Sequence, residues 1–172
     1  MEPKEPRARL SWVTYLGYQA LGSILVNAPI NWLALWPQRH RLQIGVWGGF
    51  GSAAFDTVLT ALLLTFLTVV NGSYFVRLDL ARGLVAAGPR SAGSWPNLPG
   101  RAVPRALALT AIVAPFGSAF GLAWLALGPE QLSLREFSVF KVSFACLLGV
   151  VVTPLNAHAM ITSEPPSREA GR

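Results

Sequence analysis

Four apolar blocks dominate the sequence, and each is long enough to cross a lipid bilayer. They cover residues 11–36, 53–76, 104–127 and 137–161. A helix needs roughly 20 apolar residues to cross a hydrocarbon core about 30 Å thick, whereas soluble helices are usually shorter and keep a polar face. Only 13% of the residues are charged, about half of the roughly 25% that is typical of soluble proteins. The sequence therefore predicts an all-α integral membrane protein that folds as a four-helix bundle.

The first block is interpreted as a retained helix and not as a cleaved signal peptide. Its apolar stretch is longer than the roughly 7–15 residues of a signal-peptide core, and Pro29 directly follows the small residue Ala28. We therefore expect a multi-pass protein. The basic residues are twelve Arg and two Lys, and Ala, Gly and Pro are abundant, a composition that favours a high-GC bacterium and hence its inner membrane.

Basic residues predict the orientation, because they favour the cytoplasmic side of short loops and tails. Ten of them lie in the N-terminal tail, the central loop and the C-terminal tail, which share one side of a four-helix arrangement: Lys4, Arg7, Arg9, Arg77, Arg82, Arg90, Arg101, Arg105, Arg168 and Arg172. The other four are Arg39, Arg41, Arg135 and Lys141, of which Lys141 is already inside the fourth block. We therefore expect both termini in the cytoplasm.

Two internal matches indicate a tandem repeat of helical hairpins. Residues 32–38 read WLALWPQ and residues 124–130 read WLALGPE, which are identical at five of seven positions. Blocks two and four also align without gaps at an offset of 85 residues, so that Asp56 meets Lys141 and Asn71 meets Asn156. A two-helix unit enters the membrane twice in the same direction, which predicts a parallel repeat about a pseudo-two-fold axis along the membrane normal. Coincidence among four helices of similar composition is the alternative.

This repeat divides the chain into four consecutive segments. They are a first hairpin over residues 10–77, a cytoplasmic loop over 78–103, a second hairpin over 104–161 and a tail over 162–172. The loop is rich in Gly, Pro and Arg, which are turn signals, with a short interfacial helix expected over residues 78–87. Its positive charge is expected to lie against anionic lipid, although it could serve orientation alone. The bilayer is thus an expected partner, and nucleic acid is not.

Asp56 and Lys141 are an acid and a base at equivalent positions of two apolar blocks, and ionisable residues within the membrane mark functional sites by default. One hypothesis pairs them across the pseudo-axis, where they would gate or line an outer vestibule. The alternative is structural: Asp56 would favour the positive N-terminal end of its helix, and Lys141 would extend to the headgroups. Asp56 precedes Asn71 by fifteen residues, about 22 Å of helix, so the two are expected near opposite membrane boundaries.

The remaining candidate site residues are asparagines in the apolar blocks. Asn27 and Asn31 are four residues apart and share a helix face, while Asn71 and Asn156 occupy equivalent repeat positions. Polar side chains of this kind hold helices together at about 0.6 kcal/mol each, or they line a path for a solute. Both interpretations stay open.

Counting residues argues against catalysis and cofactors. His40 falls in an outer loop and His158 near the cytoplasm, so that one monomer does not offer two axial haem ligands at one depth. Thiol redox chemistry needs two cysteines, but Cys146 is the only cysteine in the sequence. Motifs such as HExxH, GxSxG and the Walker sequence are absent. The sequence predicts no enzyme, no cofactor and no metal site.

Two functional hypotheses follow. The first is a permease-like or channel-like protein that works as a homo-oligomer, because four helices rarely enclose a complete pathway alone. The second is an accessory or anchor subunit that binds a partner protein or anionic lipid through its basic loop. Substrate and partner are not encoded in any recognisable motif.

Overall fold

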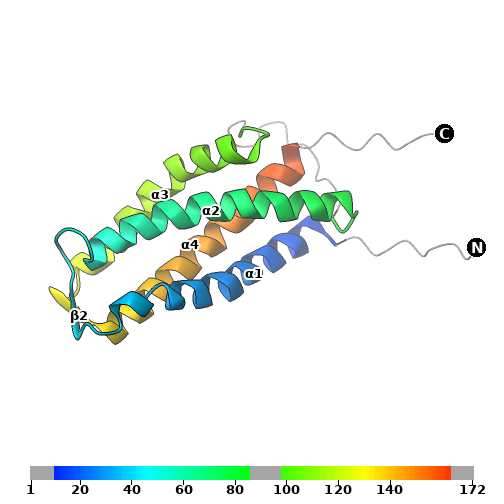
Figure 1. The fold of residues 1–172 in the computed structure, drawn as a ribbon. Helices are drawn as coiled ribbons and strands as arrows, with labels where there is room; N and C mark the ends of the chain where they lie inside the picture. The colour runs from blue at the N-terminus through cyan, green and yellow to red at the C-terminus, as the bar shows by residue number, and fades with distance from the viewer. Residues whose placement is uncertain (1–9, 86–97, 164–172) are drawn as a thin grey trace, which may run out of the picture.

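The computed structural model describes residues 10–85 and 98–163. These residues form four helices, α1 (Trp12–Leu33), α2 (Ala53–Ala81), α3 (Ala102–Ala126) and α4 (Leu134–Ser163). A short 3-10 turn (Trp36–Gln38) follows α1, and two strands, β1 (Gln43–Gly45) and β2 (Gln131–Ser133), precede α2 and α4. The four helices run alongside one another, with the strands at one end (Figure 1). The predicted all-α class is therefore correct.

Three of the described helices are long and apolar enough to cross a membrane. They are α2, α3 and residues Leu134–Thr162 of α4. The first helix, α1, has 22 residues but does not belong to this set, because polar side chains at Gln19, Ser23, Asn27 and Asn31 interrupt its apolar sequence. Three helices that fit a bilayer are consistent with a membrane protein.

Side-chain caps fix where three of the helices begin. The Ser11 hydroxyl accepts from the backbone N–H of Thr14, and Ser52 accepts from that of Phe55. At the start of α4, the Ser133 hydroxyl accepts from the N–H of Glu136 at 3.3 Å, and the Glu136 carboxylate accepts from the N–H of Ser133 at 2.8 Å. This reciprocal capping box satisfies two donors that a helix start otherwise leaves without partners.

The end of α2 differs from the sequence prediction. The helix continues through Ala81, so residues 78–81 are its last turn and do not start a separate interfacial helix. Gly83 then adopts a φ of +68°. Its N–H binds the carbonyl oxygen of Leu80, and the N–H of Leu84 binds that of Asp79. This Schellman motif depends on a left-handed residue, which glycine adopts without a Cβ penalty. Residues 86–97, which include Arg90, lie outside the described residues.

Helix packing follows a regular pairing. α1 packs along α4, and α2 packs along both α3 and α4, whereas the backbones of α1 and α2, and those of α3 and α4, come close at few points. Glycines allow the two closest approaches: a Cβ at Gly149 of α4 would overlap the Asn27 amide of α1, and a Cβ at Gly121 of α3 would lie 2.5 Å from Cγ2 of Thr57 in α2. Small residues at helix contacts are typical of membrane helices, which associate by close packing.

The strands and their neighbours close one end of the structure, called the strand end below. β1 pairs antiparallel with β2, with Ile44 opposite Leu132. Both side chains are buried in a cluster with Val46 and Phe137. This contact joins segments 88 residues apart and holds the starts of α2 and α4 together.

The opposite end, called the bridge end below, contains the start of α1 and the ends of α2 and α4. The N–H of Leu10 donates to the carbonyl oxygen of Leu84 at 2.9 Å. The Trp12 ring of α1 lies 5.8 Å from the His158 ring of α4. The described segments next to the N-terminal and C-terminal tails thus lie at the same end (Figure 1). The tails, with Lys4, Arg7, Arg9, Arg168 and Arg172, lie outside the described residues.

The observed helix bounds extend two of the predicted segments. α2 runs past residue 77 to Ala81, and α4 runs past residue 161 to Ser163. α3 begins at Ala102, two residues before the predicted start of the second hairpin. Apolar content alone does not mark the ends of α2 and α4, because the added residues include Asp79, Thr162 and Ser163.

Candidate functional site: a polar groove between α1 and α2

A groove of about 820 Å³ separates α1 from α2, with α4 contributing to its lining. It exists because α1 packs along α4 and makes few contacts with α2, its neighbour in sequence. The polar residues that line the groove come mainly from α1 and α2: Tyr15, Gln19, Ser23, Asn27, Asn31, Asp56, Thr60, Thr68, Asn71, Asp79, Lys141 and Thr153. Apolar side chains such as Ile30, Leu59 and Leu63 complete the walls.

An ion pair lies at the strand end of the groove. Nζ of Lys141 in α4 is 2.6 Å from Oδ1 of Asp56 in the first turn of α2. The Lys141 side chain is 6% exposed and that of Asp56 is 17% exposed. The hydroxyl of Thr60, one turn along α2, donates to Oδ2 of Asp56 at 3.4 Å. The structure therefore joins the two ionisable residues, and Lys141 does not extend to the surface.

This pair leaves hydrogen-bonding capacity on its groove side. An ammonium group has three N–H donors, and among the described residues Lys141 uses one of them, toward Asp56. Oδ2 of Asp56 has only the long contact from Thr60, although each carboxylate oxygen accepts two hydrogen bonds. Both side chains line the groove, so their remaining capacity is available to a molecule inside it.

Two asparagines of α1 line the same groove. Asn27 is 8% exposed and Asn31 is 7% exposed. The Asn31 side-chain nitrogen donates to the backbone carbonyl oxygen of Asn27 at 3.0 Å, whereas the Asn27 amide makes no hydrogen bond within the part of the chain that the structure describes. Thr153 of α4 also lines the groove, and its buried hydroxyl has no partner among the described residues. Buried polar groups without partners are rare in folded proteins.

Hydrogen bonds between side chains mark the bridge end of the groove. The Tyr15 hydroxyl donates to Oδ2 of Asp79 at 2.8 Å, and the side-chain nitrogen of Gln19 donates to the Tyr15 oxygen, also at 2.8 Å. Asn71 lines the groove nearby and is exposed. The groove thus carries one carboxylate near each end, Asp56 paired with a lysine and Asp79 bound to a tyrosine.

Asn156 lies apart from the other five candidate residues. It is 1% exposed and does not line the groove. Its carbonyl oxygen accepts from the Ser73 hydroxyl at 3.3 Å, and its nitrogen donates to the carbonyl oxygen of Val69 at 3.5 Å. Asn156 therefore links α4 to α2 inside the helix interface, whereas Asn71, with which it aligns at an offset of 85 residues, lines the groove.

Several groove residues were not singled out from the sequence. On α1 the polar side chains recur every four residues, at Tyr15, Gln19, Ser23, Asn27 and Asn31. Residues four apart lie on one face of a helix, so extending the pair Asn27 and Asn31 backwards would have found the whole stripe. Thr153 and Asp79 gave no comparable signal, because their place depends on which helices pack together.

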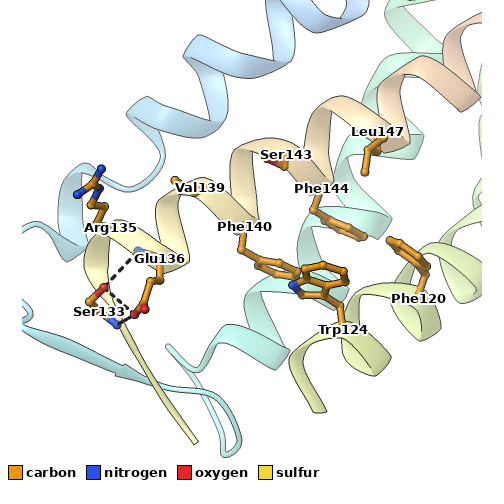
Figure 2. A pocket seen from close by; sticks show the side chains of 10 residues that line it. All are labelled: Phe120, Trp124, Ser133, Arg135, Glu136, Val139, Phe140, Ser143, Phe144 and Leu147. Carbon is orange, nitrogen blue, oxygen red and sulfur yellow. Dashed lines mark hydrogen bonds between the residues drawn. The ribbon is translucent and has the colours of Figure 1, made fainter. Parts of the chain in front are cut away.

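A second pocket, of about 700 Å³, lies between α3 and α4. Figure 2 shows Phe120 and Trp124 of α3 facing Phe140 and Phe144 of α4. Its polar groups gather at the strand end, where Ser133 and Glu136 already bind each other. This pocket is therefore mainly aromatic and offers little polar chemistry compared with the groove.

Among the described residues, no three His, Cys, Asp or Glu side chains come together in a way that would hold a metal ion. His158 packs against Trp12, and Cys146 is a free cysteine on α4. No family model matches the sequence, and no curated protein and no solved structure shows a significant match to it. The proposals below therefore rest on the geometry of the groove.

Proposed function

We propose that this chain is a permease-like or channel-like membrane protein in which the groove between α1 and α2 is the polar path. The observation that carries this proposal is the distribution of polar side chains along the whole groove. They run from the Asp56–Lys141 pair at the strand end, past Asn27 and Thr68, to Asp79 at the bridge end. Polar residues at membrane depth are costly unless they face an interior or a cavity, and these face a cavity.

In this proposal α1 is the fourth membrane-spanning helix. Its 22 residues include no charged residue and would span about 33 Å at 1.5 Å per residue. Its polar side chains line the groove, while Leu21, Leu25 and Leu33 are exposed apolar residues outside the groove lining. The bridge end is cytoplasmic in the proposed topology, because the basic tails and the central loop adjoin it. The proposed location is a bacterial inner membrane.

The pairing of the helices supports the proposed bundle of two tandem hairpins. A two-fold axis that exchanges α1 with α3 and α2 with α4 turns the α1–α4 contact into the α3–α2 contact, and both contacts are extensive. It also exchanges the two strands, which pair with each other. Asp56 and Lys141, 85 residues apart, occupy equivalent positions and contact each other, as residues beside such an axis would. The match of residues 32–35 with 124–127 is weaker in three dimensions, since Leu33 is exposed and Leu125 is buried.

The groove is not enclosed on all sides by the described residues, because the backbones of α1 and α2 come close at few points. A complete polar path therefore needs a further wall, which is why we propose a homo-oligomer. The accessory-subunit hypothesis depends on the basic central loop, of which residues 86–97 lie outside the described residues. No specific contact among the described residues favours it, and it would need no polar groove between α1 and α2.

Cysteine accessibility tests the proposed path. Cys146 is first replaced by Ala, and single cysteines are then introduced at Asn27, Asn31, Asp56 and Asn71. A membrane-impermeant, hydrophilic thiol reagent is expected to modify these positions in intact membrane vesicles, added from the side that each position faces. Matched controls are Asn156→Cys, buried between helices, and Leu62→Cys, which is 43% exposed but outside the groove lining. Protection of all four groove positions, at the level of both controls, would refute the path.

A further inference from the structure

We propose that the strand end of the groove recognises a zwitterionic group, whose ammonium binds Asp56 and whose anionic oxygens bind Lys141. This inference rests on the proposed function and names the class of molecule that enters the path. A free small zwitterion and the headgroup of a zwitterionic phospholipid share this chemistry. The Asp56–Lys141 pair is the centre of the site, and Asn27 and Asn31 of α1 line the same groove.

The charge of the site selects a molecule that carries both signs. Asp56 and Lys141 neutralise each other at 2.6 Å and are largely withdrawn from solvent. A ligand with a single charge would bring that charge into a region largely withdrawn from solvent and repel one member of the pair, and the cost of an uncompensated charge there is high. A zwitterion adds no net charge, and each of its ends meets the opposite charge. We therefore expect the site to select its ligand by the arrangement of charges on the ligand more than by the size of the ligand.

The hydrogen-bonding groups of the pair match such a ligand. Lys141 has N–H donors that no described residue accepts, which suits phosphate or carboxylate oxygens. Oδ2 of Asp56 has only the 3.4 Å contact from Thr60, which suits an N–H donor on an ammonium group. Charge-assisted hydrogen bonds of this type are roughly twice as strong as neutral ones. The existing ion pair can stay formed while the ligand adds to it.

The α1 wall supplies an independent indication of a ligand. Asn27 is 8% exposed and lines the groove, and its side-chain amide has no hydrogen-bond partner among the described residues. The oxygen of the Asn31 side chain is likewise without a described donor, since only its nitrogen bonds, to the carbonyl oxygen of Asn27. An amide both donates and accepts, so these groups can bind either end of a zwitterion. If the Asp56–Lys141 pair served only to hold α2 to α4, these amide groups would have no role.

The test compares matched ligands on the purified full-length protein in detergent. The free zwitterion is glycerophosphoethanolamine, and its control is glycerophosphoglycerol, which has the same phosphodiester but no ammonium. The lipid arm compares phosphatidylethanolamine with phosphatidylglycerol in the same way. Binding is read as a rise in the midpoint of thermal unfolding with ligand concentration. We expect a zwitterion to act at a concentration at least about tenfold lower than its anionic control, the effect of one charge-assisted hydrogen bond.

The two arms distinguish the source of the group. Stabilisation by free glycerophosphoethanolamine supports a soluble zwitterion, and stabilisation by phosphatidylethanolamine alone supports a lipid headgroup. Equal stabilisation by the anionic controls, or none by either zwitterion, would overturn the inference. Thiol accessibility of the groove is measured separately, without ligand. An accessible groove that shows no zwitterion preference defeats this inference alone, whereas a protected groove defeats the proposed function.

Variants assign the binding to the ion pair. The neutral double variant Asp56→Asn with Lys141→Gln removes both charges together, so neither remains uncompensated, and we expect at least about tenfold weaker zwitterion binding. The exchanged variant Asp56→Lys with Lys141→Asp keeps both charges and should still prefer the zwitterion. Should the neutral variant fail to fold, Asn27→Ala leaves the pair intact and should weaken zwitterion binding severalfold. Unchanged binding in a folded neutral variant, or in Asn27→Ala, would contradict the assignment.

Discussion

Breaking the Asp56–Lys141 pair from either side should have unequal costs, because the two side chains differ in exposure. At 2.6 Å and an effective dielectric constant of about 20, the Coulomb attraction is about 6 kcal/mol, from which the desolvation of both groups must be subtracted. Removing one partner of a buried pair typically costs about 3–5 kcal/mol, since it leaves the other charge uncompensated. Lys141→Met leaves Asp56, which is 17% exposed and can regain some hydration, so we expect about 3 kcal/mol.

Asp56→Asn leaves Lys141, which is only 6% exposed, so the expected loss is nearer to 5 kcal/mol. The exchanged double variant keeps an ion pair and should lie within about 1 kcal/mol of the wild type. The measurement is the free energy of unfolding in mixed detergent and SDS micelles. Glu136→Gln is the matched control, because it also neutralises a carboxylate but keeps a side chain able to complete the capping box with Ser133. Its expected change is small, because Glu136 is exposed to solvent.

The free energies of unfolding of these variants, compared with one another, test whether the ion pair stabilises the α2–α4 contact. If the single variants lose no more stability than Glu136→Gln, the pair does not hold α2 to α4 in a region withdrawn from solvent. If the exchanged variant is as unstable as the singles, the charges do not act through each other. Either result would refute the reasoning from exposure and distance.

Three further predictions follow from the helix contacts. Gly149→Ala should destabilise the protein by about 1–3 kcal/mol, because the added Cβ would overlap the Asn27 amide and displace α1 from α4. The control is Gly22→Ala, whose Cβ meets no atom within 4 Å. It should be neutral or stabilising in the same unfolding assay. Asn156→Ala should lower the free energy of unfolding by about 1 kcal/mol or more. A double-mutant cycle with Ser73→Ala should give a coupling energy of about 0.6 kcal/mol. A coupling energy of zero would show that the Asn156–Ser73 contact does not stabilise the α2–α4 interface. Tyr15→Phe deletes the hydroxyl bound to Asp79 and should cost about 1 kcal/mol, with unchanged stability as the contrary result.

The helices were predictable from the sequence, because length and apolar content fix them locally. The end of α2 was not predictable in this way, because Arg77 and Asp79 lie in or next to its last turn, and hydropathy alone assigns charged residues to a loop. The true stop signal was Gly83, whose left-handed conformation closes the Schellman motif. The end of the helix could have been predicted from Gly83, which follows a polar turn, instead of from the Pro and Gly residues further along the loop.

The candidate residues were largely predictable, but the groove was not. Ionisable and amide side chains stand out within apolar blocks, and five of the six candidates do line one groove. Which helices pack together depends on contacts between segments far apart in sequence. The α1–α4 contact needs Gly149 opposite Asn27, and the strand pairing joins Ile44 to Leu132 through only three residues on each side. Neither has a local periodic signal.

The position of the ion pair connects the proposed repeat with the proposed site. A residue beside a two-fold axis meets its own equivalent, so two identical charges there would face each other at short distance, where repulsion in a region of low polarity is strong. Opposite charges are the ionic arrangement that such a position tolerates, and Asp56 and Lys141 have this relation at an offset of 85 residues. The same divergence makes the two sides of the axis unequal: the groove between α1 and α2 is polar, and the pocket between α3 and α4 is aromatic. A duplicated unit of this kind can therefore offer one polar path instead of two, with the charged pair at its end.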